Sequence, residues 1–263
     1  MRARKRFGQN FLVDPHIIGE IVEFIDPRPG ERLVEIGPGR AALTIPVLER
    51  CPNLMAVELD RDLAALLRRS SQLKGLTLIE ADALKLDFAT LPGSGPLRIF
   101  GNLPYNISTP LLFHLLSQER VKDLHFMLQK EVAERLISSP GSRIYGRLSI
   151  MAQFYAQILP LLQVPNTAFR PVPKVQSAVV RLIPRPLRAG ERALAAPLNT
   201  TVTAAFGTRR KTLRNSLAKL FTPAQLEAQN IDPSRRAETL TLTEYLRLAR
   251  ALHQQQLQQQ EQQ

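Results

Sequence analysis

Short runs rich in apolar and β-branched residues alternate with stretches of helical pattern along the first 183 residues, and this alternation limits the fold more than any other feature. Runs expected to form strands lie at 33–36, 54–59, 76–80, 97–100 and 124–128. Helical patterns follow several of them, for example at 41–50 and 60–70. Such an alternation predicts a parallel, doubly wound α/β sheet. Two later runs, near 158–162 and 178–183, flank a Pro-rich loop and are predicted to close the sheet as an antiparallel pair.

The pattern changes after Pro184-Arg185-Pro186, a segment typical of a linker. Beyond it the chain is helical in character, which predicts an α/β domain over 1–184 and a small all-helical domain over 185–263. Five apolar residues are predicted to share one face of a helix: Val202, Phe206, Leu213, Leu217 and Leu220. A last helix is predicted over Thr241 to Leu252, and the Gln-rich tail from Gln254 is expected to be a frayed helix or disordered.

Positive charge is concentrated at the two ends of the chain. The formal net charge is +12, of which residues 1–10 carry +4 and residues 184–263 carry +6. This balance favours a polyanionic partner, most simply nucleic acid. A membrane surface would attract the same charge, but no run of about 18 apolar residues exists to span a bilayer. We therefore predict a nucleic-acid partner and no membrane association.

Cysteine and histidine are too sparse for a metal site or a disulfide framework. Cys51 is the only cysteine, and the four histidines show no ligand spacing. We therefore predict no metal and no internal disulfide. The basic N-terminus lacks the apolar run of a signal peptide, so a cytoplasmic location is expected. A monomer is expected because no apolar surface helix calls for a partner.

A glycine turn follows the first predicted strand in the run Glu35-Ile36-Gly37-Pro38-Gly39. Glycine lets the backbone approach a ligand closely, although the run lacks the third glycine of a dinucleotide fingerprint and can also be a plain strand-to-helix turn. Glu58 ends the second strand and can accept both ribose hydroxyls of a nucleoside. Asp82 ends the third strand and can accept from an adenine amine. Because Arg40 is the only cation near the turn, S-adenosylmethionine fits better than a phosphate-bearing dinucleotide.

The run Asn102-Leu103-Pro104-Tyr105 follows the fourth predicted strand and an expected break at Gly101. An exocyclic amine on a nucleobase is a poor nucleophile, because its lone pair is delocalised into the ring. The Asn102 side-chain oxygen and the Leu103 carbonyl can accept its two N–H bonds and turn the lone pair toward a methyl donor. Pro104 biases Leu103 toward an extended conformation that exposes this carbonyl. Tyr105 can stack on the base and face the cationic donor.

Six short motifs in sequence order resemble the KsgA/RsmA family of small-subunit ribosomal RNA adenine N6-dimethyltransferases over essentially the whole chain. They are Gln9–Leu12, Val34–Gly39, Glu58–Asp60, Glu80–Ala83, Asn102–Ser108 and Phe169–Val175. Together these motifs are far more specific than any one of them. Many members have a glycine where this chain has Ala41, a departure that leaves Gly37 and Gly39 in place.

The resemblance implies a seven-stranded, Rossmann-like methyltransferase sheet with its last strand antiparallel, and S-adenosylmethionine as donor. It implies two adjacent adenosines near the 3′ end of 16S rRNA as substrates, each dimethylated on N6, with a role in ribosome biogenesis. The implied cofactor pocket holds Gln9, Asn10, Leu12, Gly37, Gly39, Glu58, Asp82, Ala83 and Asn102. The target base would contact Asn102, Leu103, Pro104, Tyr105 and Phe169. Phe169 is expected on an exposed Pro-rich loop opposite Tyr105, the alternative being a core aromatic.

Two groups of basic residues are candidates for binding RNA phosphates. One is an N-terminal arm with Arg2, Arg4, Lys5 and Arg6, which can equally be a solvated tail. The other is a set that a helix is expected to fix on one surface, or that forms a solvated face: Arg209, Arg210, Lys211 and Arg214. Binding through them should weaken steeply with salt. The implied partner is the small ribosomal subunit or its precursor.

Four other functions are compatible with parts of this pattern. A large-subunit rRNA adenine methyltransferase of the macrolide-resistance type shares the chemistry and the fold, and identifying the rRNA that is modified would separate the two. A DNA adenine methyltransferase uses a related Asn-Pro-Pro-Tyr motif. A ribosome-assembly factor that has lost methylation is disfavoured by the intact glycine turn and Asn102–Tyr105. A mitochondrial transcription-factor relative is disfavoured because no transit peptide is evident.

Overall fold

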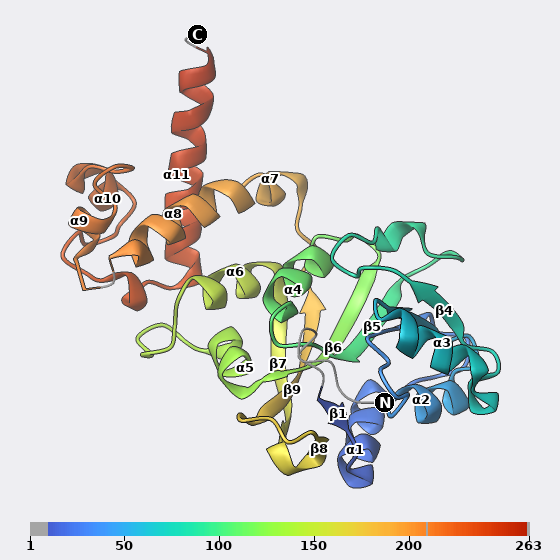
Figure 1. The fold of residues 1–263 in the computed structure, drawn as a ribbon. Helices are drawn as coiled ribbons and strands as arrows, with labels where there is room; N and C mark the ends of the chain where they lie inside the picture. Colours follow the sequence, from blue (N-terminus) through green and yellow to red (C-terminus); the bar gives the residue numbers. More distant parts are fainter. Residues whose placement is uncertain (1–9, 209, 262–263) are drawn as a thin grey trace. The chain divides into compact units, whose positions relative to one another are not determined.

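The protein forms two compact units in a computed structural model that describes residues 10–208 and 210–261 (Figure 1). The first unit runs to Ala133 and also includes Gln157–Pro184, and the second comprises Glu134–Ala156 and the chain from Arg185 onward. The chain changes unit at the expected linker. Residues 134–156, which the sequence pattern placed in the α/β domain, group with the second unit because α6 (Arg147–Tyr155) contacts α8 (Ala195–Gly207) and α11 (Leu242–Glu261).

The first unit is built on a seven-stranded sheet with the strand order β4-β3-β2-β5-β6-β9-β7. Its strands are β2 (Leu33–Ile36), β3 (Met55–Glu58), β4 (Thr77–Glu80), β5 (Leu97–Asn102), β6 (Val121–Gln129), β7 (Ala156–Val164) and β9 (Ser177–Pro184). Strands β2 to β6 pair in parallel, and β9 runs antiparallel to β6. This confirms the predicted α/β sheet, and it sets the carboxyl ends of β2, β3, β4 and β5 along one edge.

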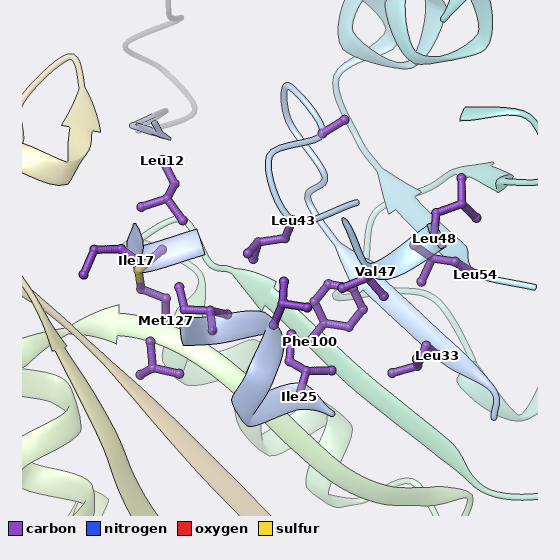
Figure 2. Packing of buried hydrophobic residues seen from close by; sticks show 14 of the residues in the cluster. Leu12, Ile17, Ile25, Leu33, Leu43, Val47, Leu48, Leu54, Phe100 and Met127 are labelled. Atoms are coloured by element: carbon purple, nitrogen blue, oxygen red, sulfur yellow. The ribbon is translucent and has the colours of Figure 1, made fainter. Parts of the chain in front are cut away.

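Helices α1 (Pro15–Ile25), α2 (Thr44–Arg50) and α3 (Arg61–Arg69) contribute apolar side chains to a core shared with the sheet. The Asp14 carboxylate caps α1 by accepting hydrogen bonds from the backbone N–H groups of His16 and Ile17. Figure 2 shows the packing of this core around Ile17, Ile25, Leu33, Phe100 and Met127. Helices α4 (Ser108–Leu116) and α5 (Lys130–Ile137) follow β5 and β6. The core therefore fixes the strands whose ends carry the polar residues singled out by the sequence.

Gly101 lies within β5, which continues through Asn102, so the expected break at this glycine is wrong. A Cβ atom built at position 101 would collide with the carbonyl oxygen of Ile36 at the end of β2. Glycine is needed here because the two neighbouring backbones approach closely. The close approach brings Asn102 beside the turn that follows β2.

The second unit is helical and contains α6, α7 (Ala189–Arg192), α8, α9 (Leu213–Ser216), α10 (Pro223–Ala228) and α11. The single helical face predicted from Val202 to Leu220 is wrong, because α8 ends at Gly207 and α9 begins only at Leu213. The apolar pattern marks residues that are buried, such as Val202, Leu213 and Leu217, although they do not belong to one continuous helix. Helix α11 continues through the Gln-rich segment to Glu261. None of the described helices has the length and apolar character that crossing a bilayer requires.

Candidate active site

A pocket of about 380 Å³ opens at the carboxyl ends of the parallel strands, within the first unit. Its size is typical of a small-molecule site. The lining residues come from the segment before α1 and from the loops after four strands: Asn10, Phe11, Leu12, Glu35, Ile36, Gly37, Pro38, Gly39, Arg40, Ala42, Leu43, Val57, Glu58, Leu59, Asp60, Leu63, Ala81, Asp82, Ala83, Asn102, Leu103, Pro104, Tyr105, Asn106 and Ile107. The structure thus brings together the predicted cofactor and target-base residues, except Phe169 and Gln9. Gln9 lies outside the described residues.

The turn after β2 adopts left-handed backbone conformations at Gly37, Gly39 and Ala41, with φ of +68°, +57° and +66°. The first two are glycines, which occupy this region without steric cost. Ala41 adopts the same region although its Cβ makes this conformation sterically unfavourable. The Gly37 N–H donates to the Val57 carbonyl at 2.9 Å, which ties the turn to β3.

The Glu58 carboxylate is held at the end of β3 by two backbone groups. Its Oε1 accepts from the N–H of Asp60 at 2.8 Å, and its Oε2 accepts from the N–H of Gly39 at 3.4 Å. Burial raises the pKa of Glu58, and these hydrogen bonds oppose the rise. The carboxylate therefore links the glycine turn to β3 and lines the pocket as the sequence predicts.

Asp82 and Ala83 lie in the loop after β4, on the wall formed by neighbouring strand ends. The Asp82 Oδ1 accepts from the N–H of Leu84 at 3.0 Å, and this contact orients the carboxylate. Ala83 is buried against the pocket.

Glu35 is a pocket residue that the sequence reasoning did not assign. It lies in β2 between Val34 and Ile36, is 2% exposed, and its Oε2 has no hydrogen-bond partner among the described residues. Burial raises its pKa to about 8, opposed by the Thr44 hydroxyl and reinforced by the Glu58 charge. The sequence contains a signal that could have identified Glu35, because it is an acid within an otherwise apolar four-residue strand and such a buried acid calls for a functional explanation.

The Asn102 side chain is anchored through its nitrogen. Its Nδ2 donates to the Asn10 carbonyl at 3.1 Å, so the amide presents Oδ1 as its remaining acceptor. The Leu103 N–H donates to the Met127 carbonyl of β6 at 3.2 Å. The next two carbonyls are engaged, that of Pro104 by the Ile107 N–H and that of Tyr105 by the Ser108 hydroxyl.

Tyr105 is half-buried in the pocket wall, and its hydroxyl lies 3.0 Å from the hydroxyl of Ser177 at the start of β9. Ser177 was not predicted from the sequence. Another unpredicted contact involves Phe11 and Arg40, whose guanidinium carbon lies 4.4 Å from the Phe11 ring centroid in a cation–π arrangement. Long-range pairing of this kind leaves no local signal in a sequence.

Phe169 is 1% exposed and belongs to the hydrophobic core, so its expected position on an exposed loop is wrong. It lies on the two-residue strand β8 (Phe169–Arg170), which pairs antiparallel with β1 (Phe11–Leu12). Successive residues of a strand face opposite sides, so Phe169 points inward and Arg170 outward. The alternative of a core aromatic is the one this structure supports.

The predicted basic residues are described only in part. Arg2, Arg4, Lys5, Arg6 and Arg209 lie outside the described residues. Arg210 and Lys211 are exposed on the turn between α8 and α9, and Arg214 is exposed on α9. The expectation that one helix fixes this group is therefore wrong. Among the residues the structure describes, no cluster of three or more His, Cys, Asp or Glu side chains has the arrangement of a metal site.

Comparison with known proteins gives a consistent result. The sequence profile described as "Ribosomal RNA adenine dimethylase" matches residues 1–254. The chain is 56% identical over 258 residues to "Ribosomal RNA small subunit methyltransferase A" of Aeromonas hydrophila, covering 97% of this chain and 95% of the relative. The protein of the same name from Colwellia psychrerythraea is 55% identical over 251 residues, with coverages of 94% and 83%.

Solved structures show the same fold. A dimethyladenosine transferase from Plasmodium falciparum superposes with a TM-score of 0.77 at 23% identity, covering 94% of this chain and 98% of that one. The 23S rRNA methyltransferase ErmE gives a TM-score of 0.70 at 25% identity, with coverages of 92% and 99%.

Proposed function

The chain belongs to the ribosomal RNA adenine dimethylase family, and on that premise we propose that it transfers two methyl groups to N6 of each of two adjacent adenosines near the 3′ end of 16S rRNA. The proposed donor is S-adenosylmethionine, which supplies an electrophilic methyl group on a sulfonium sulfur. The orientation of Asn102 is the observation that carries the mechanism, because its bond to Asn10 leaves Oδ1 as the acceptor for the target amine.

The pocket fits an adenosyl donor without phosphates. The Glu58 carboxylate is fixed by two N–H groups, and its remaining lone pairs can accept ribose hydroxyls. Asp82 lies at the end of the neighbouring strand and can accept a hydrogen bond from the adenine amine of the donor. The left-handed turn at Gly37 and Gly39 lets the backbone come close to the bound molecule. The carboxylates of Glu58 and Asp82 line the pocket and favour a cationic ligand, whereas they would repel a pyrophosphate.

The target base must leave its stack to reach the pocket. The Tyr105 ring can then stack on it, at about 1–3 kcal/mol for a base–aromatic contact. Asn102 Oδ1 and the Leu103 carbonyl accept the two amine protons and direct the lone pair toward the methyl group. Phe169 has no role in this proposal, because it is buried away from the pocket lining.

Catalysis rests on positioning rather than on a strong base. The N6 proton becomes acidic once positive charge develops on the nitrogen, so solvent can accept it. The two acceptors stabilise that charge as it forms. In each transfer the N–C bond forms while the S–C bond breaks, and one N6 proton leaves.

The substrate is proposed to be rRNA within the small subunit or its precursor, which links the activity to ribosome biogenesis. The second unit is the proposed RNA-binding domain, with Arg210, Lys211 and Arg214 as exposed phosphate contacts. The N-terminal arm and Arg209 are proposed to contribute further contacts.

A methyl-transfer assay tests the function directly. The protein is incubated with labelled S-adenosylmethionine and unmethylated small subunits, large subunits or duplex DNA, and the nucleosides of the product are analysed. Dimethyladenosine confined to 16S rRNA supports the proposal. Labelling of 23S rRNA instead would favour the activity named for ErmE, and labelling of DNA would place the enzyme outside rRNA modification. Tight subunit binding without any transfer would favour a non-catalytic assembly role.

A further inference from the structure

The hydroxyl groups of Tyr105 and Ser177 form a hydrogen bond of 3.0 Å behind the pocket wall. Tyr105 lines the pocket, whereas Ser177 is fully buried with 0% of its surface exposed. Because the Tyr105 hydroxyl is already engaged, its contribution to the site comes from the ring rather than from proton transfer through the phenol.

Ser177 is held rigidly by strand pairing. It stands opposite Gln129 in the antiparallel β6–β9 ladder. Beside it, the Lys130 N–H donates to the Gln176 carbonyl at 3.0 Å, and the Lys130 Nζ donates to the Gln176 Oε1 at 3.2 Å. A serine in this setting cannot shift without disturbing the sheet, so it gives the Tyr105 hydroxyl a fixed anchor.

The Tyr105 loop is attached to the same part of the sheet at a second point. The Leu103 N–H donates to the Met127 carbonyl of β6, two residues before Gln129. The loop backbone is therefore hydrogen-bonded directly to β6. The Tyr105 hydroxyl is hydrogen-bonded to β9, which in turn pairs with β6. This double attachment fixes the plane of the ring relative to the Leu103 carbonyl.

We propose that Ser177 is a positioning residue for the target base, and that the second methyl transfer depends on it more than the first. This inference rests on the proposed function. It assigns no chemical step to Ser177, which acts only through the orientation of the Tyr105 ring.

The reason lies in the number of protons on the amine. An unmodified N6 amine has two N–H bonds, and both can be accepted, one by Asn102 Oδ1 and the other by the Leu103 carbonyl. After one transfer a single N–H remains, so one of the two hydrogen bonds is lost, each being worth about 0.5–1.5 kcal/mol. Stacking on Tyr105 must then supply a larger share of the orientation. A ring free to tilt therefore harms the second transfer more.

The experiment measures both steps on unmethylated small subunits. Wild type and Ser177→Ala are mixed with S-adenosylmethionine under single-turnover conditions, and monomethyl- and dimethyladenosine are quantified over time. We expect the first rate to fall less than about threefold and the second at least about tenfold, so that monomethyladenosine accumulates. Tyr105→Phe removes the same hydrogen bond and should give the same product ratio. Ser177→Thr keeps the hydroxyl and should restore dimethylation.

A matched control uses another buried hydroxyl pair. Ser149 is fully buried and its Oγ lies 2.9 Å from that of Ser138, within the second unit. Ser149→Ala should leave the ratio of the two rates unchanged even where it lowers stability. The double variant Ser177→Ala with Tyr105→Phe should be no worse than either single variant, because both remove one contact.

The outcomes separate this inference from the function on which it rests. If the wild type forms no dimethyladenosine on 16S rRNA, the proposed function fails. If the wild type dimethylates normally and Ser177→Ala slows both transfers equally, or changes neither, the positioning role is refuted. If Ser177→Ala does not fold, Tyr105→Phe decides the matter alone, since it removes the bond without altering the β6–β9 ladder.

Discussion

Asn102 Nδ2 donates a hydrogen bond to the carbonyl of Asn10, a residue 92 positions earlier in the chain. The bond joins the segment before α1 to the end of β5 across the pocket wall. It also leaves the Asn102 Oδ1 as the atom that can bind the target amine, because an amide nitrogen can only donate and its oxygen can only accept. The orientation that the proposed chemistry needs is thus present before any substrate binds.

Asn102→Asp should therefore lower the methyl-transfer rate. A carboxylate has no N–H to donate, so it loses the bond to Asn10 and faces a carbonyl oxygen instead. We expect a fall on the order of 10²–10³-fold, as for loss of one preorganised group that stabilises a transition state. Single-turnover methylation of small subunits measures it. Asn53→Asp, the same change at an exposed position, should leave the rate intact. A rate for Asn102→Asp within threefold of wild type would contradict the proposed role.

Gly101→Ala should destabilise the first unit, because the added methyl group would collide with the Ile36 carbonyl. Relief requires β2 and β5 to separate, and we expect a cost of about 2–4 kcal/mol in the free energy of unfolding, in the upper part of the range for single substitutions. Gly19→Ala is the control, since Gly19 lies in α1 with no atom near a new Cβ. That change should stabilise by up to about 1 kcal/mol. Urea denaturation of both variants measures the contrast, and equal midpoints would refute the clash.

The part of the site that could be predicted follows from one rule of α/β sheets. The resemblance implies that Gly37, Glu58, Asp82 and Asn102 line one cofactor pocket. Each lies at or just after the end of a predicted strand, and parallel strands end at the same edge of a sheet. All four line the pocket of this structure. This part of the pocket can be predicted from local sequence patterns, because it requires only the positions of the strand ends and no contact between distant segments.

The contacts that the sequence did not predict depend on pairing between distant segments. Ser177 meets Tyr105 across 72 residues, and Phe169 turns inward because β8 pairs with β1. Arg210 and Lys211 lie on a turn because α8 ends at Gly207, although an apolar pattern continues past it. A periodic pattern reports which side chains are buried, and it does not report where a helix is interrupted or which strand a short segment joins.

Glu35 should make stability fall as pH rises. Burial raises its pKa to about 8 from an ordinary value of 4.5. Below pH 4.5 Glu35 is protonated in both the folded and the unfolded states, so it does not lower the free energy of unfolding. Between pH 4.5 and 8 the unfolded state releases the proton first, and unfolding becomes easier by up to about 1.4 kcal/mol per pH unit. Glu35→Gln should remove this slope, which guanidinium denaturation at pH 5, 6, 7 and 8 measures. Parallel pH dependences of the two proteins would show that Glu35 titrates normally.

Replacing Arg210, Lys211 and Arg214 together with alanine should weaken binding to small subunits and flatten its salt dependence. Each phosphate contact adds about 0.7–0.9 to the slope of log K against log salt, so the triple variant should lose up to about 2–3. The matched control changes three exposed cations of the first unit, Arg61, Arg69 and Lys74, and removes the same charge. Filter binding from 50 to 300 mM salt measures both. If the two variants behave alike, net charge rather than this turn governs binding.

Binding of S-adenosylmethionine should release a proton from Glu35. Near pH 7 the carboxyl is largely protonated, because its pKa of about 8 lies above that pH. The sulfonium charge enters the pocket that Glu35 lines and favours the ionised carboxylate. Calorimetric titrations in phosphate and in Tris, which differ in ionisation enthalpy, should therefore give different apparent binding enthalpies for the wild type and equal ones for Glu35→Gln. S-adenosylhomocysteine lacks the sulfonium charge and should release fewer protons from the wild type. Equal release with both ligands would mean that Glu35 responds to pocket closure rather than to the charge of the methyl donor.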